Sequence, residues 1–387
     1  MKLRTIKDIK EVKGKRFLVR VDLNAPIKDG HLGSTDLWKL RASIHTVEYI
    51  TERGGSVIIL SHFGRPDGRR DAATSMKRVV KKFAQLLGQP IEVWDYPVTK
   101  WLRLSHKLQP GTVVALENLR WHKGEESNSP QFSKQLAALG DYYVNDAFGV
   151  IQRKHASTYG ITKYRPSYAG FLLEYEVRNL YNLLSRAKRP IVAVMGGSKI
   201  GSKIGLIKKM LDRVDYVLLG GALANNVLMA RNVNIGRSLV DREVKALDGY
   251  LMDNKLRLPV DARVASSLKT KSRITAIGKV RASEIIYDLG PDTVELYAAI
   301  LKKAKTVIWN GPLGYFEDQR YAWSTRKLIE QLAAHKSEDY VGGGETVKAV
   351  LQSRLEDRLH FVSTGGGAML ALLENPKLPV LQQLIKK

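Results

Sequence analysis

The sequence repeats one unit, in which a short apolar run is followed by a turn of glycine or polar residues and then by apolar residues at helical spacing. The first copy begins with Arg16–Leu23, whose β-branched valines predict a buried strand. Apolar residues then recur every three or four positions from Leu37 to Ile50, and Gly54 follows as a helix stop. Repeated strand–helix units are typical of an α/β fold in which helices cover both faces of a mostly parallel sheet.

The same unit recurs along the chain, and 387 residues are too many for a single core. Further predicted strands are Val57–Leu60, Val113–Leu116, Tyr142–Asn145, Ile191–Met195, Tyr216–Leu219 and Thr306–Trp309. A predicted helix from Leu172 to Leu184 connects the halves and would act as a stiff hinge. We therefore predict two domains, with three as the alternative, built on doubly wound parallel sheets (Rossmann-like) and divided by a helical hinge near Arg165–Arg189.

Cations and hydrogen-bonding groups follow the predicted strands of the first half. They are Asp22, Asn24, His62, Arg65, Arg120 and Arg153. Ligands of parallel sheets bind at the carboxyl ends of the strands, so these side chains predict a pocket for a small, multiply anionic molecule. Any one of them alone could be a surface charge or a satisfied polar group, but their repetition at successive strand ends favours an anion site.

Glycine turns follow nearly every predicted strand of the second half. They are Gly196-Gly197, Gly220-Gly221, Gly311, Gly342-Gly343-Gly344 and Gly365-Gly366-Gly367. We expect backbone N–H groups of these turns to bind nucleotide phosphates. The first turn is not a phosphate-binding P-loop, because Ser202 and Lys203 are transposed. Lys199 and Lys203 lie four residues apart and suit a polyphosphate, although two exposed lysines would give the same pattern.

The segment Val341–Val350 combines a triple-glycine turn with a helix start that carries Glu345. A carboxylate would repel a bare phosphate there, and the conflict disappears if Glu345 binds Mg²⁺ and the Mg²⁺ binds the phosphates. An ordinary acidic first helical turn is the alternative.

The composition of the chain limits the classes of partner that we expect it to bind. Lys and Arg number 63 and Asp and Glu 38, a formal net charge of +25, yet no basic block is interleaved with aromatic residues as in a nucleic-acid groove. We therefore do not expect specific nucleic-acid binding. No run approaches the roughly 18 apolar residues of a membrane helix. The chain has no cysteine and no apolar signal-peptide core after Met1, which fits a cytoplasmic protein.

Seven segments together resemble the phosphoglycerate kinase family, in the family's order from near residue 16 to near residue 374. They are Arg20–Pro26, Ser61–Pro66, Leu116–Arg120, Val144–Gly149, Leu258–Asp261, Trp309–Pro312 and Ser363–Ala368. The resemblance implies two similar-sized doubly wound parallel-sheet domains around a cleft, residues 1–170 and 171–377, joined by a helical hinge that closes them for in-line phosphoryl transfer. The first would bind 3-phosphoglycerate or 1,3-bisphosphoglycerate, and the second ADP or ATP with Mg²⁺. It also implies a monomeric, cytoplasmic, glycolytic enzyme whose tail, residues 378–387, packs on the first domain.

The resemblance also assigns roles by matching motif. Phosphoglycerate would be bound by Asp22, Asn24, Lys39, His62, Arg65, Arg120, Gln152 and Arg153, and catalysis would involve Lys199, Lys39 and Arg65. The nucleotide would contact Gly197, Lys199, Lys203, Gly220, Gly221, Asn310, Pro312, Glu317, Gly342, Gly343, Gly344, Glu345 and Thr346. Gly365 and Gly366 would border the cleft, and Glu345 would bind the metal.

Three of these positions depart from the family pattern. Lys39 stands where the family has a catalytic arginine, Gln152 where it usually has a histidine, and Glu345 where it has an aspartate. Ala222, in place of a third glycine, is a smaller departure. Each keeps a polar group of similar function, so we interpret the chain as a working enzyme. The alternative is a catalytically impaired relative that binds nucleotide or polyanions. A nicotinamide dehydrogenase is disfavoured, since no G-x-G-x-x-G turn precedes a suitably spaced acid.

Overall fold

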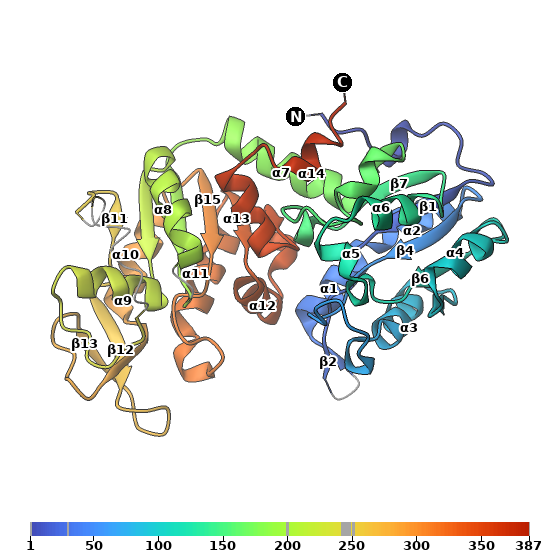
Figure 1. Cartoon of the computed structure of the whole chain (residues 1–387). Helices are drawn as coiled ribbons and strands as arrows, with labels where there is room; N and C mark the ends of the chain where they lie inside the picture. Colours follow the sequence, from blue (N-terminus) through green and yellow to red (C-terminus); the bar gives the residue numbers. More distant parts are fainter. Residues whose placement is uncertain (1, 29–30, 199–200, 241–248, 250–251, 387) are drawn as a thin grey trace. The chain divides into compact units, whose positions relative to one another are not determined.

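The structure, a computed structural model, describes residues 2–28, 31–198, 201–240, 249 and 252–386 (Figure 1). The chain divides into two compact units, Met1–Tyr181 with Asn375–Lys387, and Asn182–Glu374. The division falls inside α7 (Phe171–Arg186), the helix that the sequence predicts between the halves. The C-terminal residues belong to the first unit, where Leu3 forms an isolated bridge with Ile385.

The first unit is built on a six-stranded sheet in which every neighbouring pair is parallel. In sheet order its strands are β5 (Glu92–Trp94), β6 (Val113–Leu116), β4 (Ser56–Leu60), β1 (Arg16–Arg20), β7 (Tyr142–Asn145) and β8 (Ser167–Ala169). Its helices are α1 (Ser34–Ala42), α2 (Ile44–Thr51), α3 (Lys77–Leu87), α4 (Val98–Ser105), α5 (Lys123–Glu126), α6 (Pro130–Ala137) and α14 (Pro379–Gln382). Two short strands, β2 (Ile27–Lys28) and β3 (His31–Leu32), pair in antiparallel fashion.

Both faces of this sheet are buried, as a doubly wound fold requires. On β1, Phe17 and Val19 belong to one hydrophobic cluster, together with Val80 of α3. Leu18 points to the other face and belongs to a second cluster with Trp101 of α4 and Leu136 of α6. Alternate residues of one strand thus anchor two layers of helices.

The second unit repeats the architecture with a second six-stranded parallel sheet. In sheet order its strands are β11 (Leu256–Arg257), β10 (Tyr216–Leu219), β9 (Ile191–Met195), β15 (Thr306–Asn310), β16 (Glu338–Gly342) and β17 (Phe361–Val362). Its helices are α8 (Gly201–Arg213), α9 (Gly221–Ala230), α10 (Pro291–Leu301), α11 (Trp323–Ala334), α12 (Gly344–Ser353) and α13 (Gly366–Glu374). The predicted fold class is confirmed.

Two features differ from the sequence expectation. The segment from Leu37 to Ile50 is two helices, because the chain turns at Ser43, whose N–H donates to Leu40 O (3.2 Å) in a tighter i→i+3 bond. The second unit also carries an antiparallel sheet of β13 (Arg273–Ala276), β12 (Asp261–Ala265) and β14 (Ile285–Leu289). Charged residues interrupt these strands, so they do not read as apolar runs.

Candidate functional site

In the first unit, the predicted anion-binding residues lie at one edge of the sheet. β1, β4 and β6 are parallel neighbours in the order β6-β4-β1, and β7 follows β1. Their carboxyl ends therefore place Asp22, His62, Arg120 and Asp146 at adjacent positions. The fold thus brings the residues that follow these strands to one edge of the sheet, as the sequence pattern predicts.

Gly64, in the turn after β4, is held through both its N–H and its C=O by residues that follow other strands. Asn24 Oδ1 accepts from Gly64 N (3.0 Å), and Arg120 Nη1 donates to Gly64 O (2.7 Å). Gly64 has φ +64°, the left-handed region that favours glycine. The neighbouring Arg65 is exposed, so its guanidinium is available to a ligand.

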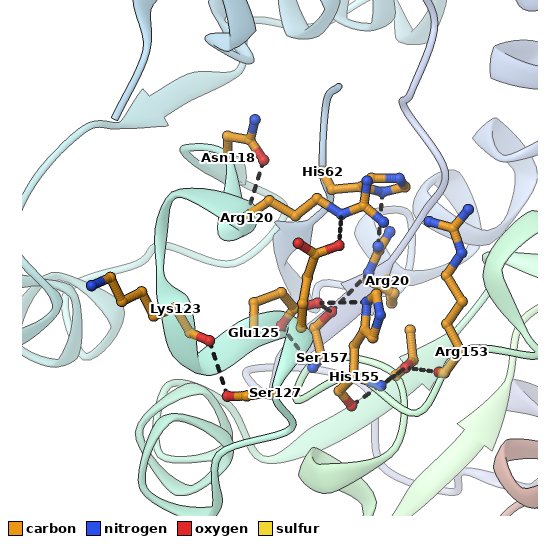
Figure 2. Close-up of polar contacts among 12 residues, drawn as sticks. Arg20, His62, Asn118, Arg120, Lys123, Glu125, Ser127, Arg153, His155 and Ser157 are labelled. Atoms are coloured by element: carbon orange, nitrogen blue, oxygen red, sulfur yellow. Dashed lines mark hydrogen bonds and ion pairs between the residues drawn. The ribbon is translucent and has the colours of Figure 1, made fainter. Parts of the chain in front are cut away.

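A buried chain of hydrogen bonds lies under this edge (Figure 2). Glu125 is fully buried and accepts from Ser157 N (3.0 Å) and Ser157 Oγ (2.6 Å). Arg20 Nε donates to the same Ser157 Oγ (3.0 Å), and Arg20 Nη2 lies 3.0 Å from His62 Nδ1. The chain Glu125–Ser157–Arg20–His62 thus connects a buried carboxylate to a histidine of the site.

These hydrogen bonds determine which ring nitrogen of His62 carries the proton. A guanidinium has only donors, so Nδ1 of His62 accepts from Arg20 and the ring proton lies on Nε2. His62 Nε2 is buried and has no hydrogen-bond partner among the described residues. Burial, followed by the charges of Arg20 and Arg120, lowers the pKa of His62 well below its usual range. His62 Nε2 is therefore a neutral N–H donor without an acceptor among the described residues, which makes it a candidate to bind a ligand oxygen.

Positive charge surrounds that donor. Arg120 is buried and pairs through Nε with Glu126 Oε1 (3.1 Å), and the charge of Arg153 acts on both Arg120 and His62. Figure 2 shows the side chains of Arg120, His62 and Arg153 reaching toward one region. Guanidinium groups together with a neutral N–H donor suit an anion with several oxygens, such as a phosphate or a carboxylate.

The same environment makes one histidine a source of pH-dependent stability. Burial, and then the charges of Arg120 and Arg20, lower the pKa of His155 from 6.5 to about 4. Between these pH values only the unfolded chain binds this proton, so stability is lost as the pH falls below about 6.5. We expect the unfolding free energy of the native chain to fall about 2 kcal/mol more than that of His155→Gln between pH 7 and pH 5. Denaturant titrations at both pH values measure this difference, and parallel losses in the two proteins would contradict it.

The remaining predicted residues of the first unit lie beside this cluster. Burial raises the pKa of Asp36 at the start of α1. The charge of Lys39 lowers this pKa and the charge of Asp22 raises it, so both side chains lie near Asp36. The Asp22 carboxylate lies against Gly149, where a Cβ would come within 2.4 Å of Asp22 Oδ2. Gln152 Oε1 is buried and has no hydrogen-bond partner among the described residues.

In the second unit, the glycine turns line two adjoining cavities that share Gly197, Ser198 and Glu345. One cavity, about 310 Å³, is mostly apolar, and its lining includes Ala222, Leu239, Ile286, Leu313, Tyr315 and Glu317. The other, about 390 Å³, is lined by Asn310, Gly343, Gly344, Thr346, Gly366 and Leu370 among others. An apolar cavity beside a glycine-lined one suits the base and the phosphates of a nucleotide.

The glycine N–H groups are used differently from the prediction. Those of Gly196, Gly197, Gly220 and Gly221 donate to the carbonyls of Asn310, Pro312, Met195 and Leu313. These four N–H groups tie the turns to one another and are not free for phosphates. The first turns of α12 and α13 are the remaining candidates for binding nucleotide phosphates, because their N–H groups have no intrahelical partner.

Two predicted nucleotide contacts also have internal partners. Asn310 Nδ2 donates to Gly342 O (3.0 Å), and Thr346 Oγ1 accepts from Gly311 N (2.7 Å). Both side chains are buried and join the turn after β15 to the turn after β16. Thr346 therefore supports the shape of the glycine-lined cavity, whatever it contacts in a complex.

Glu345 is exposed in the first turn of α12 and lines both cavities. Among the described residues no group of three or more His, Cys, Asp or Glu side chains could hold a metal ion. Mg²⁺ commonly binds through one or two carboxylates together with substrate phosphates, and a single Glu345 beside a phosphate cavity fits that mode. Lys199 lies outside the described residues, as does the side chain of Lys203.

Sequence reasoning missed the supports of the first site, namely Arg20, Glu125 and Ser157. Arg20 gives one signal, because it is a charged residue inside an apolar strand and must find a partner when buried. Its partner Ser157 is 137 positions away, and no local pattern identifies it.

A family model of phosphoglycerate kinase matches residues 6–376. This chain belongs to the phosphoglycerate kinase family. It is 41% identical over 394 residues to "Phosphoglycerate kinase" of Chloroflexus aggregans, covering 98% of both chains. It is 39% identical over 392 residues to that of Moorella thermoacetica, covering 99% of both.

Solved structures of the family resemble this chain along nearly its whole length. The structure of phosphoglycerate kinase from Coxiella burnetii has a TM-score of 0.83 and 35% identity, covering 99% of this chain and 98% of that one. The enzyme from Pyrococcus horikoshii OT3 has a TM-score of 0.84 at 28% identity and the same coverage. The fold of this family member is thus established over its length. Among the described residues, no helix is both long and apolar enough to span a bilayer.

Proposed function

We propose that this family member transfers a phosphoryl group reversibly between 1,3-bisphosphoglycerate and ADP, giving 3-phosphoglycerate and ATP, with Mg²⁺ as cofactor. Membership of the family along nearly the whole chain makes it a phosphotransferase. The observation that carries the proposal is the pair of candidate sites, one in each unit. One unit holds a cationic cluster with a buried donor on His62 that has no partner among the described residues, and the other holds a glycine-lined cavity beside an apolar one.

In the first unit we propose that the phosphoglycerate binds at the strand ends. His62 would donate from Nε2 to a substrate oxygen, while Arg65, Arg120 and Arg153 balance its negative charge. Lys39 would contact the transferring phosphoryl group from α1. Asp22, Asn24 and Gln152 complete the proposed substrate contacts.

In the second unit we propose that the base lies in the apolar cavity and the phosphates in the glycine-lined one. Glu317 would contact the ribose, and Gly343, Gly344 and the first turn of α12 would receive the phosphates. Gly365 and Gly366 would border the same space. The proposed roles of Lys199 and Lys203, toward the transferring phosphoryl and the nucleotide phosphates, rest on the family motif alone.

Transfer needs little covalent help from the protein. It requires two anions held in line, water excluded, and positive charge where the oxygens become more negative. We propose that closure of the two units about α7 brings the ligands together, because each unit holds one of them. Mg²⁺, held by Glu345 and the phosphates, would neutralise charge on the nucleotide.

The test is a coupled assay of ATP formation from 1,3-bisphosphoglycerate and ADP in the presence of Mg²⁺. The proposal predicts turnover that requires both substrates. Binding of nucleotide without turnover would instead favour the impaired relative, which no observation on the described residues supports. We further propose a monomeric, cytoplasmic enzyme with no specific nucleic-acid partner, as the family resemblance implies.

Lys39 provides a test of the first departure. Lysine keeps the charge of the family's arginine but lacks its planar pair of donors, so it binds a phosphoryl group with fewer directed bonds. We expect Lys39→Arg to raise kcat about 3- to 10-fold with little change in KM for ADP. Steady-state kinetics measures this change. An unaltered kcat would mean that position 39 does not contact the transferring group.

Glu345 provides a test of the metal. Its exposed carboxylate is one methylene longer than the family's aspartate, and its removal would leave the Mg²⁺ without a protein ligand. We expect Glu345→Ala to raise the Mg²⁺ concentration for half-maximal rate at least about tenfold. Glu345→Asp, the control variant, should keep that concentration within about threefold. If Glu345→Ala keeps the native Mg²⁺ dependence, the metal role is wrong.

A further inference from the structure

A third cavity of the second unit lies at the opposite edge of the sheet from the glycine turns. Its volume is about 450 Å³. Several of its lining residues lie at the amino ends of the strands: Lys305 comes immediately before β15, Lys336 two residues before β16 and His360 immediately before β17. Since these strands are parallel, their amino ends share one edge, away from the carboxyl ends that form the proposed nucleotide site. We call this cavity the basic pocket.

The basic pocket concentrates positive charge. Four cations line it, Lys188, Lys305, Lys336 and Arg358, together with His335 and His360. The one carboxylate of the lining, Glu338, is paired with Lys188 at 2.9 Å. Lys305, Lys336 and Arg358 form no ion pair in the described part of the chain. Like charges gathered around one concavity repel each other, and a bound anion relieves that repulsion.

Backbone contacts fix the frame that carries these side chains. Lys188 N donates to Thr306 Oγ1 (3.0 Å), which donates in turn to Lys188 O (2.9 Å). Glu338 N donates to Lys305 O (2.9 Å), so the residues before β15 and β16 are joined. His335 Nε2 lies 3.3 Å from Ala304 O and must donate to it, because a carbonyl only accepts. The pocket is therefore shaped before any ligand arrives.

We infer that the basic pocket binds a small anion that carries two or three phosphate groups. Its volume is in the range of small-molecule sites and too small for a nucleic-acid strand. A single-stranded nucleic acid would also need exposed aromatic faces for stacking, whereas Tyr340, the aromatic neighbour of His360, is buried. The inference concerns an edge of the sheet that the proposed catalysis does not use. It gives a role to part of the +25 net charge.

The test uses inorganic tripolyphosphate as the probe and isothermal calorimetry in about 0.15 M salt, where general charge attraction is screened. The variant Lys305→Glu with Lys336→Glu reverses two charges of the pocket. The matched control, Lys269→Glu with Lys271→Glu, makes the same charge change on an exposed loop of the same unit. Lys305→Gln with Lys336→Gln removes the charges without adding carboxylates, in case the reversal impairs folding.

We expect the native chain and the control to bind one more equivalent of tripolyphosphate than the glutamate variant of the pocket. Binding to that site should weaken at least tenfold in the glutamine variant and disappear in the glutamate variant. Equal weakening in the pocket and control variants would assign the binding to the general field and overturn the inference. A glutamate variant that keeps every equivalent, or a glutamine variant that keeps the native affinity, would also overturn it. Because the readout is binding stoichiometry, it does not depend on whether the chain forms ATP.

Discussion

Replacing Arg120 with alanine should lower kcat/KM for 3-phosphoglycerate by roughly a thousandfold, the largest loss we expect in the first unit. The guanidinium is buried, donates to Gly64 O at 2.7 Å and pairs with Glu126 at 3.1 Å. Its removal takes away a desolvated charge and also the bond that holds the Gly64 turn beside Arg65. Removing one partner of a desolvated, hydrogen-bonded charge pair with a ligand costs about 2–5 kcal/mol of binding, and each 1.36 kcal/mol of transition-state stabilisation is a factor of ten in rate.

Two control variants distinguish the loss of a positive charge from the loss of the specific contacts of residue 120. Arg120→Lys keeps the charge but cannot bond in both directions, so an intermediate loss is expected. Arg103→Ala removes an exposed arginine of α4 in the same unit and should leave the kinetics unchanged. The dissociation constant for ADP, measured by calorimetry, should be unaffected in all three. If Arg120→Ala retains a tenth or more of native kcat/KM, the cationic cluster is not the phosphoglycerate site.

Replacing Gly366 with alanine should destabilise the second unit by about 3 kcal/mol or more and weaken ADP binding at least a hundredfold. A Cβ at Gly366 would lie 2.3 Å from Gly343 Cα and 2.5 Å from Gly343 N. Both are backbone atoms, so the start of α13 and the glycine turn before α12 must move apart. That movement opens the cavity proposed for the phosphates.

The adjacent glycine supplies a matched control for the stability arm. A Cβ at Gly367 meets nothing within 4 Å, so Gly367→Ala should leave the unfolding midpoint unchanged. Thermal unfolding measures the stability of both variants, and calorimetry measures ADP affinity in Gly366→Ala. Equal unfolding midpoints for the two variants would show that Gly343 and Gly366 are not in backbone contact.

The sequence was informative wherever a buried strand is bounded by turn residues. Val113–Leu116, Tyr142–Asn145 and Ile191–Met195 are strands with the predicted bounds, because continuous apolar runs of this length are buried on both faces of a parallel sheet. Residues just past such strands fall at the ligand edge of the sheet. The candidate residues Asp22, His62 and Arg120 could therefore be named without a structure.

The rest depends on contacts between distant segments. The proton position on His62 follows from Arg20, which is oriented by Ser157 and Glu125 from another part of the chain. The glycine N–H groups of the second unit looked free in sequence, yet four of them are used between turns. Sequence reasoning missed the antiparallel sheet of β12, β13 and β14, since charged residues such as Arg263 interrupt the apolar pattern of its strands.

The most direct test of the account is to follow the γ-phosphate of labelled ATP. Incubated with 3-phosphoglycerate and Mg²⁺, the chain should move the label to 3-phosphoglycerate as an acyl phosphate, and no label should move when either 3-phosphoglycerate or Mg²⁺ is omitted. Label released only as inorganic phosphate, or retained on ATP while both ligands are bound, would contradict the proposal that the two sites work together in phosphoryl transfer.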